Sequence, residues 1–235
     1  MNNLGDLEKN LRVKFKNKDL LAQALVHKSY LNENPEVKVE SNERLEFLGD
    51  AILSFLVAEK LFGKYHNLPE GELTNLRSLL VRTSTLARLA KRLKIGQFLQ
   101  LSKGEAGEGG NNNPNILADS LEAIIGAIYL DSGMSSAKRF IQQQIFAHLP
   151  ELTKDGNNHD FKGRLQIILQ EKFHITPKYR ILSEIGPDHA KDFEMGVYVG
   201  RKLLAKGIGK NHKEASQAAA RTALRNLKSG LAKDI

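Results

Sequence analysis

The 235-residue chain contains no cysteine and no tryptophan, and only 6% of its residues are aromatic. The lack of cysteine excludes disulfide bonds, zinc sites with cysteine ligands and catalysis by a thiolate. The longest run of apolar residues and glycine, around 123–130, is far shorter than the roughly 20 residues of a membrane helix. The start, MNNLGDLEKN, lacks the apolar core of a signal peptide. We therefore expect a soluble cytoplasmic protein without a membrane partner.

The positive charge of the chain is concentrated in its last third. Residues 161–235 contain 15 Lys and Arg against 7 Asp and Glu, a net charge of +8, whereas residues 1–160 contain 20 of each and are neutral. A basic module attached to a neutral one is typical of proteins that bind nucleic acid. On charge alone, the alternative is a basic surface that is merely solvated.

The segment 149–159, LPELTKDGNNH, has the Pro, Gly and Asn content of a linker, and it lies where the charge changes. We therefore predict a first domain over residues 1–150, a linker over 151–159 and a second domain over 160–230. The sequence contains no internal repeat.

Apolar residues of the first domain recur at helical spacing, and no run alternates as a half-buried strand does. One long stretch, 102–114, reads as a loop, and a loop of that length is usually functional or disordered. The second domain changes pattern and predicts the order α-β-β-β-α, with elements that include 161–169, 179–182, 193–199, 203–208 and 214–227. The predicted fold class is a multidomain chain, an all-α domain followed by a small α+β domain.

Two acidic clusters interrupt apolar helical patterns in the first domain. The first lies in ERLEFLGD, where three acids fall within about 60° around the helix axis; they are Glu43, Glu46 and Asp50. The second is Asp119 with Glu122, at i, i+3 spacing in LADSLEAI. A buried carboxylate without a partner is costly, so both clusters predict bound cations.

The clusters contain neither cysteine nor histidine, so their ligands would all be oxygen atoms, which suits hard cations such as Mg²⁺ or Mn²⁺. Two such ions can support hydrolysis of a phosphodiester. The alternatives are a helix cap for Asp119 and Glu122, and an exposed, solvated stripe for Glu43 and Glu46. Glu70 follows Pro69 and equally suits the start of a helix.

The sequence NERLEFLGD at 42–50 resembles the signature of bacterial ribonuclease III. ILADSLEAIIGA at 116–127 resembles the second acidic motif of that family, and residues 160–227, with DFKGRLQ, GPDH and KEA, resemble its double-stranded-RNA-binding domain. The resemblance covers nearly the whole chain in family order.

The resemblance implies a role for each acid. Metal ligands would be Glu46, Asp50, Asp119 and Glu122, with Asp50 and Glu122 catalytic and Glu122 the most critical. The cofactor would be Mg²⁺, with Mn²⁺ able to substitute. Glu43 and Glu70 would contact RNA near the cleaved bond. The family is a homodimer, and Phe47 matches a residue that packs into the partner subunit.

The low aromatic content argues independently for duplex RNA, because readers of single strands stack bases on aromatic side chains. By the resemblance, the RNA-binding residues would include Gln166, His189, Lys210, His212 and Lys213. The chain departs from the family pattern at Ile167, His212, Ser216 and Asn111–Asn113, which bears on RNA affinity.

The implied function is a metal-dependent endoribonuclease that cuts double-stranded RNA to leave 5′-phosphate and 3′-hydroxyl ends, in the processing and decay of rRNA precursors and mRNA. The alternative from another class is a protein that binds duplex RNA without cutting it. Clustered acids argue against that alternative, because negative charge near phosphate weakens binding. A phosphohydrolase of small molecules would leave the basic domain unexplained.

Overall fold

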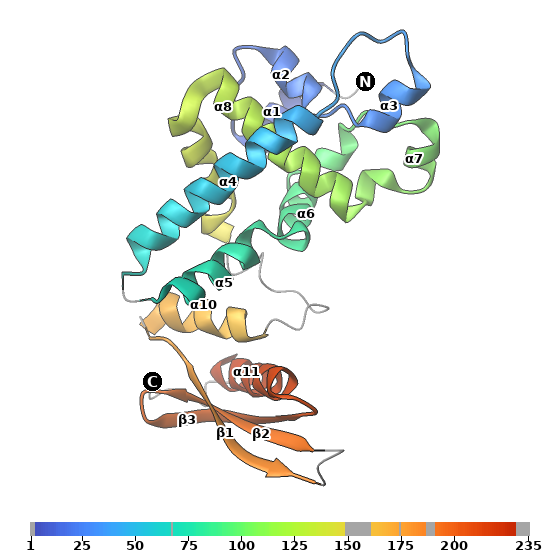
Figure 1. Cartoon of the computed structure of the whole chain (residues 1–235). Coiled ribbons are helices and arrows are strands. Elements are labelled where there is room, and N and C mark those ends of the chain that lie inside the picture. The colour runs from blue at the N-terminus through green and yellow to red at the C-terminus, as the bar shows by residue number, and fades with distance from the viewer. Residues whose placement is uncertain (1–2, 67, 149–160, 174, 187–190, 229–235) are drawn as a thin grey trace. The chain divides into compact units, whose positions relative to one another are not determined.

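The computed structural model describes residues 3–66, 68–148, 161–173, 175–186 and 191–228. The chain divides into two compact units, Met1–Leu152 and Thr153–Ile235 (Figure 1). The expected linker 151–159 lies outside the described residues, so its boundaries remain a prediction.

Helices are the regular elements of the described part of the first unit, as the periodicity predicts. A single isolated bridge, between Val26 and Gln100, is the one β-type pairing among these described residues. The helices and helical turns are α1 (Leu4–Leu11), α2 (Lys18–Gln23), α3 (Lys28–Glu33), α4 (Glu43–Lys64), α5 (Glu70–Val81), α6 (Thr83–Arg92), η1 (Ile95–Gln97), α7 (Lys103–Gly107), η2 (Gly110–Asn112), α8 (Pro114–Gln144) and η3 (Phe146–His148).

The long stretch 102–114, predicted as a loop, is in fact structured by α7 and η2. The hydroxyl of Ser102 accepts a hydrogen bond from the Glu105 N–H at 3.1 Å and so caps α7. The Lys103 N–H donates to the carboxylate of Glu33 at 2.6 Å. The loop prediction was wrong because it rested on glycine and asparagine content, whereas these contacts come partly from residues far away in the sequence.

Two long helices, α4 and α8, cross at the centre of the first unit (Figure 1). Their buried side chains make much of the core, including Leu53, Val57, Leu121 and Ile125. The helical course of α8 is broken at Gly133, which has φ 77° and ψ 178°, a backbone conformation that favours glycine. The acids of both clusters lie on these two helices.

The second unit has the predicted order α-β-β-β-α. Its elements are α10 (Phe161–Phe173), β1 (Lys178–Ile185), β2 (Asp192–Val199), β3 (Lys202–Gly209) and α11 (His212–Lys228). The strands form an antiparallel sheet in the order β1-β2-β3, in which Val197 pairs with Tyr179 and with Ala205.

Both helices of the second unit pack on one face of the sheet. Leu165 and Leu169 of α10 and the small side chains of α11 share a core with Val197 and Ala205. A Cβ at Gly207 would overlap the backbone of Ala219, so glycine in β3 permits α11 to approach the sheet closely. The alanines of α11 serve the same close packing.

No helix within the described residues combines the length and apolar character needed to cross a membrane.

Candidate active site and RNA-binding residues

The acid cluster forms where α4 begins and crosses α8. Asn42, which is buried, precedes α4, and its N–H donates to the carbonyl oxygen of Val26 at 2.8 Å. Glu43 is the first residue of α4, and Glu46 lies one turn further along it. The N-terminus of a helix favours negative charge, which helps α4 to begin with two acids.

Two glycines determine how closely the two helices approach. A Cβ at Gly49 would overlap the carbonyl oxygen of Glu122, and a Cβ at Gly126 would overlap the carbonyl oxygen of Leu45. The backbones therefore touch at this crossing, with no side chain between them. This contact brings Glu46 of α4 beside Asp119 and Glu122 of α8.

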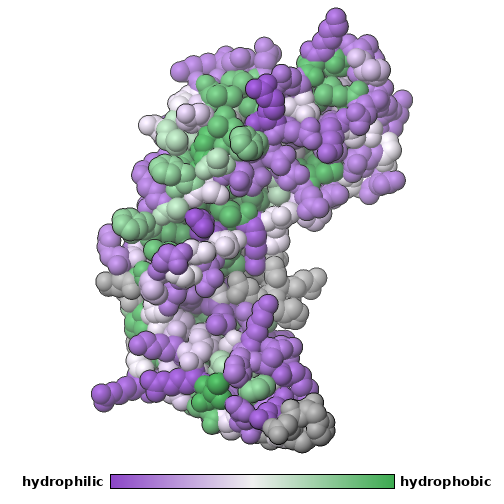
Figure 2. Space-filling view, viewed as in Figure 1, coloured by the Kyte–Doolittle hydropathy of each residue, from purple (hydrophilic) through white to green (hydrophobic). Residues whose placement is uncertain are grey.

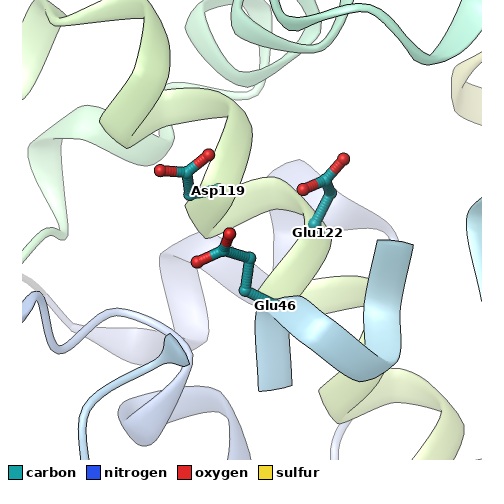
Figure 3. A group of neighbouring side chains, drawn as sticks. All are labelled: Glu46, Asp119 and Glu122. Atoms are coloured by element: carbon teal, nitrogen blue, oxygen red, sulfur yellow. The ribbon is translucent and has the colours of Figure 1, made fainter. Parts of the chain in front are cut away.

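Glu46 of α4 and Asp119 and Glu122 of α8 extend in a similar direction, and their carboxylates gather at the helix crossing (Figure 3). One carboxylate oxygen from each lies within 4.8 Å of those from the other two. All three side chains are half-buried, and none forms an ion pair with a residue that the structure describes. Three converging carboxylates with only oxygen donors fit a hard divalent cation.

The electrostatics of the cluster favour a bound cation. Burial, followed by the charges of Asp50, Asp119 and Glu46, raises the pKa of Glu122 to about 8. Burial also raises the pKa of Glu46 and of Asp119, and the charge of Asp119 adds to the effect on Glu46. These carboxyl groups resist ionisation together unless a cation arrives.

Asp50, the fourth predicted metal ligand, is exposed and does not belong to the group of three. Its charge nevertheless raises the pKa of Glu122, so it lies at the edge of the cluster. Glu70 begins α5, is exposed, and accepts a hydrogen bond from the Thr74 hydroxyl at 2.8 Å. The position of Glu70 as the first residue of α5, after Pro69, matches the alternative interpretation of Glu70 as a residue of a helix start.

Glu43 has partners of its own. Its carboxylate pairs with the ammonium of Lys28 at 3.2 Å and accepts a hydrogen bond from the Ser41 hydroxyl at 3.0 Å. The hydrogen bond from Ser41 and then the one from Lys28 lower the pKa of Glu43. The sequence alone did not predict a role for Lys28, because Lys28 lies 15 residues before Glu43 and no local pattern links the two.

Phe47 is 81% exposed, on the outer side of α4. Further exposed apolar side chains lie on α4 and α8: Phe55, Phe62, Leu130 and Met134. Apolar patches follow the course of α4 on the molecular surface (Figure 2). A cavity of about 680 Å³ opens beside Phe47, between α2, α4 and Leu130. The sequence did not distinguish these exposed residues from the core, because they lie in apolar stretches of α4 and α8 whose other side chains are buried.

The predicted RNA-binding residues of the second unit lie mainly around the start of α11. Lys210 is ion-paired with Asp192 at 3.0 Å, and the His212 ring meets the Phe193 ring edge-on, with centroids 4.4 Å apart. Lys213 is exposed in the first turn of the helix. Separately, Gln166 is half-buried on α10. His189 lies outside the described residues.

The start of α11 is fixed by reciprocal caps. The Glu214 N–H donates to the side chain of Asn211 at 2.9 Å, and the Glu214 carboxylate accepts from the Lys210 N–H at 3.0 Å. This arrangement holds the backbone that carries Lys210, His212 and Lys213.

Two departures from the family pattern lie in the interior. Ile167 is buried in α10, and Ser216 is buried with its hydroxyl donating to the Lys213 carbonyl oxygen at 2.9 Å. Neither can meet RNA at the surface. Asn113 caps α8 by accepting from the Asn115 N–H at 2.9 Å, whereas Asn111 and Asn112 are exposed in η2.

Comparison with known proteins assigns both units to established classes. Residues 17–149 match the family described as ribonuclease-III-like, and residues 161–227 match the double-stranded RNA binding motif. A helical nuclease unit followed by this RNA-binding fold defines an endoribonuclease of double-stranded RNA.

The chain belongs to the ribonuclease III family. It is 42% identical over 227 residues to a Ribonuclease 3 of Dehalococcoides mccartyi, covering 97% of this chain and 96% of that protein. It is 42% identical over 221 residues to a Ribonuclease 3 of Fusobacterium nucleatum, covering 94% of each.

A solved structure supports the helical fold of the first unit. The nuclease domain of a ribonuclease III from Campylobacter jejuni, described for flexibility in a region involved in dimer formation, is 44% identical, with a TM-score of 0.59. The match covers 63% of this chain and 99% of the solved chain.

Proposed function

We propose that this endoribonuclease depends on divalent metal ions held by Glu46, Asp119 and Glu122, with Asp50 at the edge of the site. The convergence of the three half-buried carboxylates supports the proposal most directly. Mg²⁺ suits such an oxygen-only site, and Mn²⁺ has similar ligand preferences. When bound, the ion would polarise the phosphate and lower the pKa of water.

The residues of the chain prepare this site. Since burial and the neighbouring acids raise the pKa of Glu122 to about 8, its carboxyl group carries a proton near neutral pH in the metal-free protein. Metal binding would displace that proton. The contact of Gly49 with the Glu122 backbone holds the acids in place, so the ligands need little rearrangement.

We further propose that hydrolysis leaves 5′-phosphate and 3′-hydroxyl ends, and that the substrates are rRNA precursors and mRNA in the cytoplasm. A direct test is cleavage of a long RNA duplex by the full chain after removal of divalent ions. We expect no products in EDTA, recovery on adding Mg²⁺ or Mn²⁺, and products that a 5′-phosphate-dependent exonuclease digests. Cleavage in EDTA at the full rate would contradict the proposal.

The RNA contacts are proposed at both units. Near the cleaved bond they are Glu43 and Glu70, and on the second unit Gln166, His189, Lys210, His212 and Lys213. The exposed position of Lys213 at the start of α11 supports a contact with phosphate, because a helix N-terminus attracts anions. Single alanine variants measured for duplex affinity, in Ca²⁺ to limit cutting, would rank these contacts.

We propose that the active enzyme is a homodimer joined through the outer side of α4. Phe47 is exposed beside a cavity of about 680 Å³, and Phe55, Phe62 and Leu130 extend the apolar surface. Large exposed apolar patches usually mark an interaction site. Sedimentation equilibrium should give a dimer for the wild type and a monomer for Phe47→Asp, whereas an unchanged dimer would contradict this face.

The domain boundaries are proposed at residues 150 and 160. The division of the chain into two compact units supports them. A fragment ending at Asp155 should fold and lose duplex affinity at physiological salt, because it lacks the segment that carries the net charge of +8. An unchanged affinity would contradict the assignment of RNA binding to the second domain.

A further inference from the structure

The ammonium group of Lys28 lies beside the acid cluster and has no role in the proposed metal site. The ammonium of Lys28 lies 3.2 Å from the Glu43 carboxylate, and 63% of the Lys28 side chain is exposed. Glu43 lies one turn before Glu46 on α4, on the same side of the helix. Lys28 therefore stands at the rim of the group formed by Glu46, Asp119 and Glu122.

The backbone around Lys28 is tied to the helix that carries the acids. The carbonyl oxygen of Val26 accepts from the Asn42 N–H at 2.8 Å, one residue before α4 begins. The His27 N–H donates to the Gln100 carbonyl oxygen at 3.0 Å.

A second set of contacts fixes the start of α3, where Lys28 is the first residue. The His27 side chain caps this helix by accepting from the Ser29 N–H at 3.3 Å. The Ser29 hydroxyl in turn accepts from the Ser102 N–H at 3.1 Å. The backbone of Lys28 is thus held in place, although its ammonium group is exposed to solvent.

The positive charge of Lys28 affects the acids of the cluster. It lowers the pKa of Glu46 and of Asp119, against the larger effect of burial, and His27 also lowers the pKa of Asp119. Three ionised carboxylates outweigh the charge of one divalent ion, so an approaching phosphodiester still meets repulsion in this partly desolvated site. A cation at the rim offsets that repulsion where the RNA strand would enter.

We propose that Lys28 binds a backbone phosphate of the RNA strand at the edge of the acid cluster, and that Glu43 positions its ammonium. The inference rests on the proposed role of the cluster in cleavage. It also gives Glu43 a way to act on RNA. An ionised carboxylate repels phosphate, whereas a carboxylate that holds an ammonium group presents a donor to it.

The competing account is that Lys28 only neutralises Glu43. In that case Lys28→Met would alter the local charge, and its effect on cleavage would not depend on any one phosphate of the RNA. The experiment must therefore connect the side chain to a single position of the RNA.

The test compares wild type, Lys28→Met and Lys28→Arg in cleavage of a short duplex with one defined cut. We expect Lys28→Met to lower kcat/KM about tenfold or more, the value of one charge-assisted hydrogen bond. Lys28→Arg should remain within about threefold of wild type, because it keeps the charge and the donors. Lys9→Met is the matched control, since Lys9 is an exposed lysine paired with Asp6 at 2.8 Å on α1.

The same enzymes are then tested on duplexes that carry one uncharged methylphosphonate, placed in turn at each linkage around the cut. A 2′-deoxy phosphodiester at the same position is the reference RNA. At one linkage the uncharged group should slow wild type and Lys9→Met about tenfold and leave Lys28→Met nearly unchanged. That pattern identifies the phosphate that Lys28 contacts.

Equal penalties in wild type and Lys28→Met at every linkage would overturn the inference, as would wild-type kcat/KM in Lys28→Met. Thermal unfolding and Mn²⁺ binding of Lys28→Met should match wild type; a loss of either that Lys28→Arg shares would assign Lys28 a structural role and overturn the inference. Failure of the wild type to require a divalent ion would contradict the metal proposal instead, so the two failures are distinguishable.

Discussion

The acid cluster of the first unit and the basic surface of the second unit handle charge in opposite ways. Glu46, Asp119 and Glu122 are half-buried and lack an ion pair with any residue that the structure describes. On the second unit, Lys206 and Lys210 are paired with acids of β2, at 3.4 and 3.0 Å. The negative charge of the acid cluster has no ion-paired partner among the described residues, whereas the positive charge of these lysines is already partly neutralised.

This difference determines what each site can do. Uncompensated, partly desolvated acids gain a large free energy from an added cation, so the site depends strongly on its ligand and on its packing. Exposed, paired lysines exchange one partner for another at small cost, so RNA binding by the second unit should be graded and sensitive to salt. The contrast predicts large losses from changes in the acid cluster and small changes from variants of the second unit.

Removing one acid from the cluster should have the largest effect. Glu122→Gln keeps the size of the side chain and loses the charge that holds metal. Because a metal ion supplies several kcal/mol of transition-state stabilisation, cleavage should fall roughly a thousandfold. Duplex affinity, measured without divalent ions, should be unchanged. Glu59→Gln is the control, an exposed acid of α4 paired with Lys138, and wild-type cleavage by Glu122→Gln would refute the assignment.

Packing beneath the acids should matter almost as much. In Gly49→Ala the new methyl group overlaps the backbone of Glu122, so the helices must separate and the free energy of unfolding should fall by about 2 to 3 kcal/mol. Gly63→Ala, on the same helix with open space around it, should instead stabilise by roughly 0.5 to 1 kcal/mol. Urea unfolding measures both, and equal behaviour of the two variants would count against the close crossing.

Several features of this architecture follow from the sequence alone. The spacing of 43, 46 and 50 predicts a shared helix face, and alternation in β2 predicts its buried residues Met195 and Val197. The convergence of Glu46 with Asp119 and Glu122 requires the crossing of two helices, which spacing within one motif cannot reveal. The family resemblance indicated that these three acids share a site. The close approach of α4 and α8 at Gly49 and Gly126 explains how they come together.

Tertiary pairs were beyond prediction. Lys28 with Glu43 and Lys210 with Asp192 join residues whose local sequences give no sign of each other. The capped helix α7 was missed because composition alone suggests a loop. Such contacts depend on how whole elements pack, and sequence patterns report only the elements themselves.

The metal-free acid cluster should also make stability depend on pH. The pKa of Glu122 is raised from 4.5 to about 8, so between these values the folded chain holds a proton that the unfolded chain has released. The free energy of unfolding should therefore fall as pH rises through this window. Thermal unfolding in EDTA between pH 5 and 8 should show this decrease in stability, and the decrease should be weaker in Glu122→Gln. The same pH dependence in both proteins would contradict the role of Glu122.

The smallest effect should come from the second unit. Asp192→Asn releases Lys210 from its ion pair, so duplex affinity should tighten by about two- to fivefold, the scale of an exposed pair. Glu194→Gln makes the same charge change beside Lys206 and tests for a general charge effect. Titration of a fluorescent duplex compares the two variants, and an equal gain in both would remove any specific role for Lys210.

Glu46, Asp119 and Glu122 should together bind a divalent metal ion. We would test this claim by titrating the full chain with Mn²⁺ in the absence of RNA and measuring the free ion by electron paramagnetic resonance. Wild type and Glu59→Gln should bind alike, and Glu122→Gln should bind at least about a hundredfold more weakly, because site affinity follows the charge of the ligands. Equal Mn²⁺ affinity in wild type and Glu122→Gln would contradict the claim.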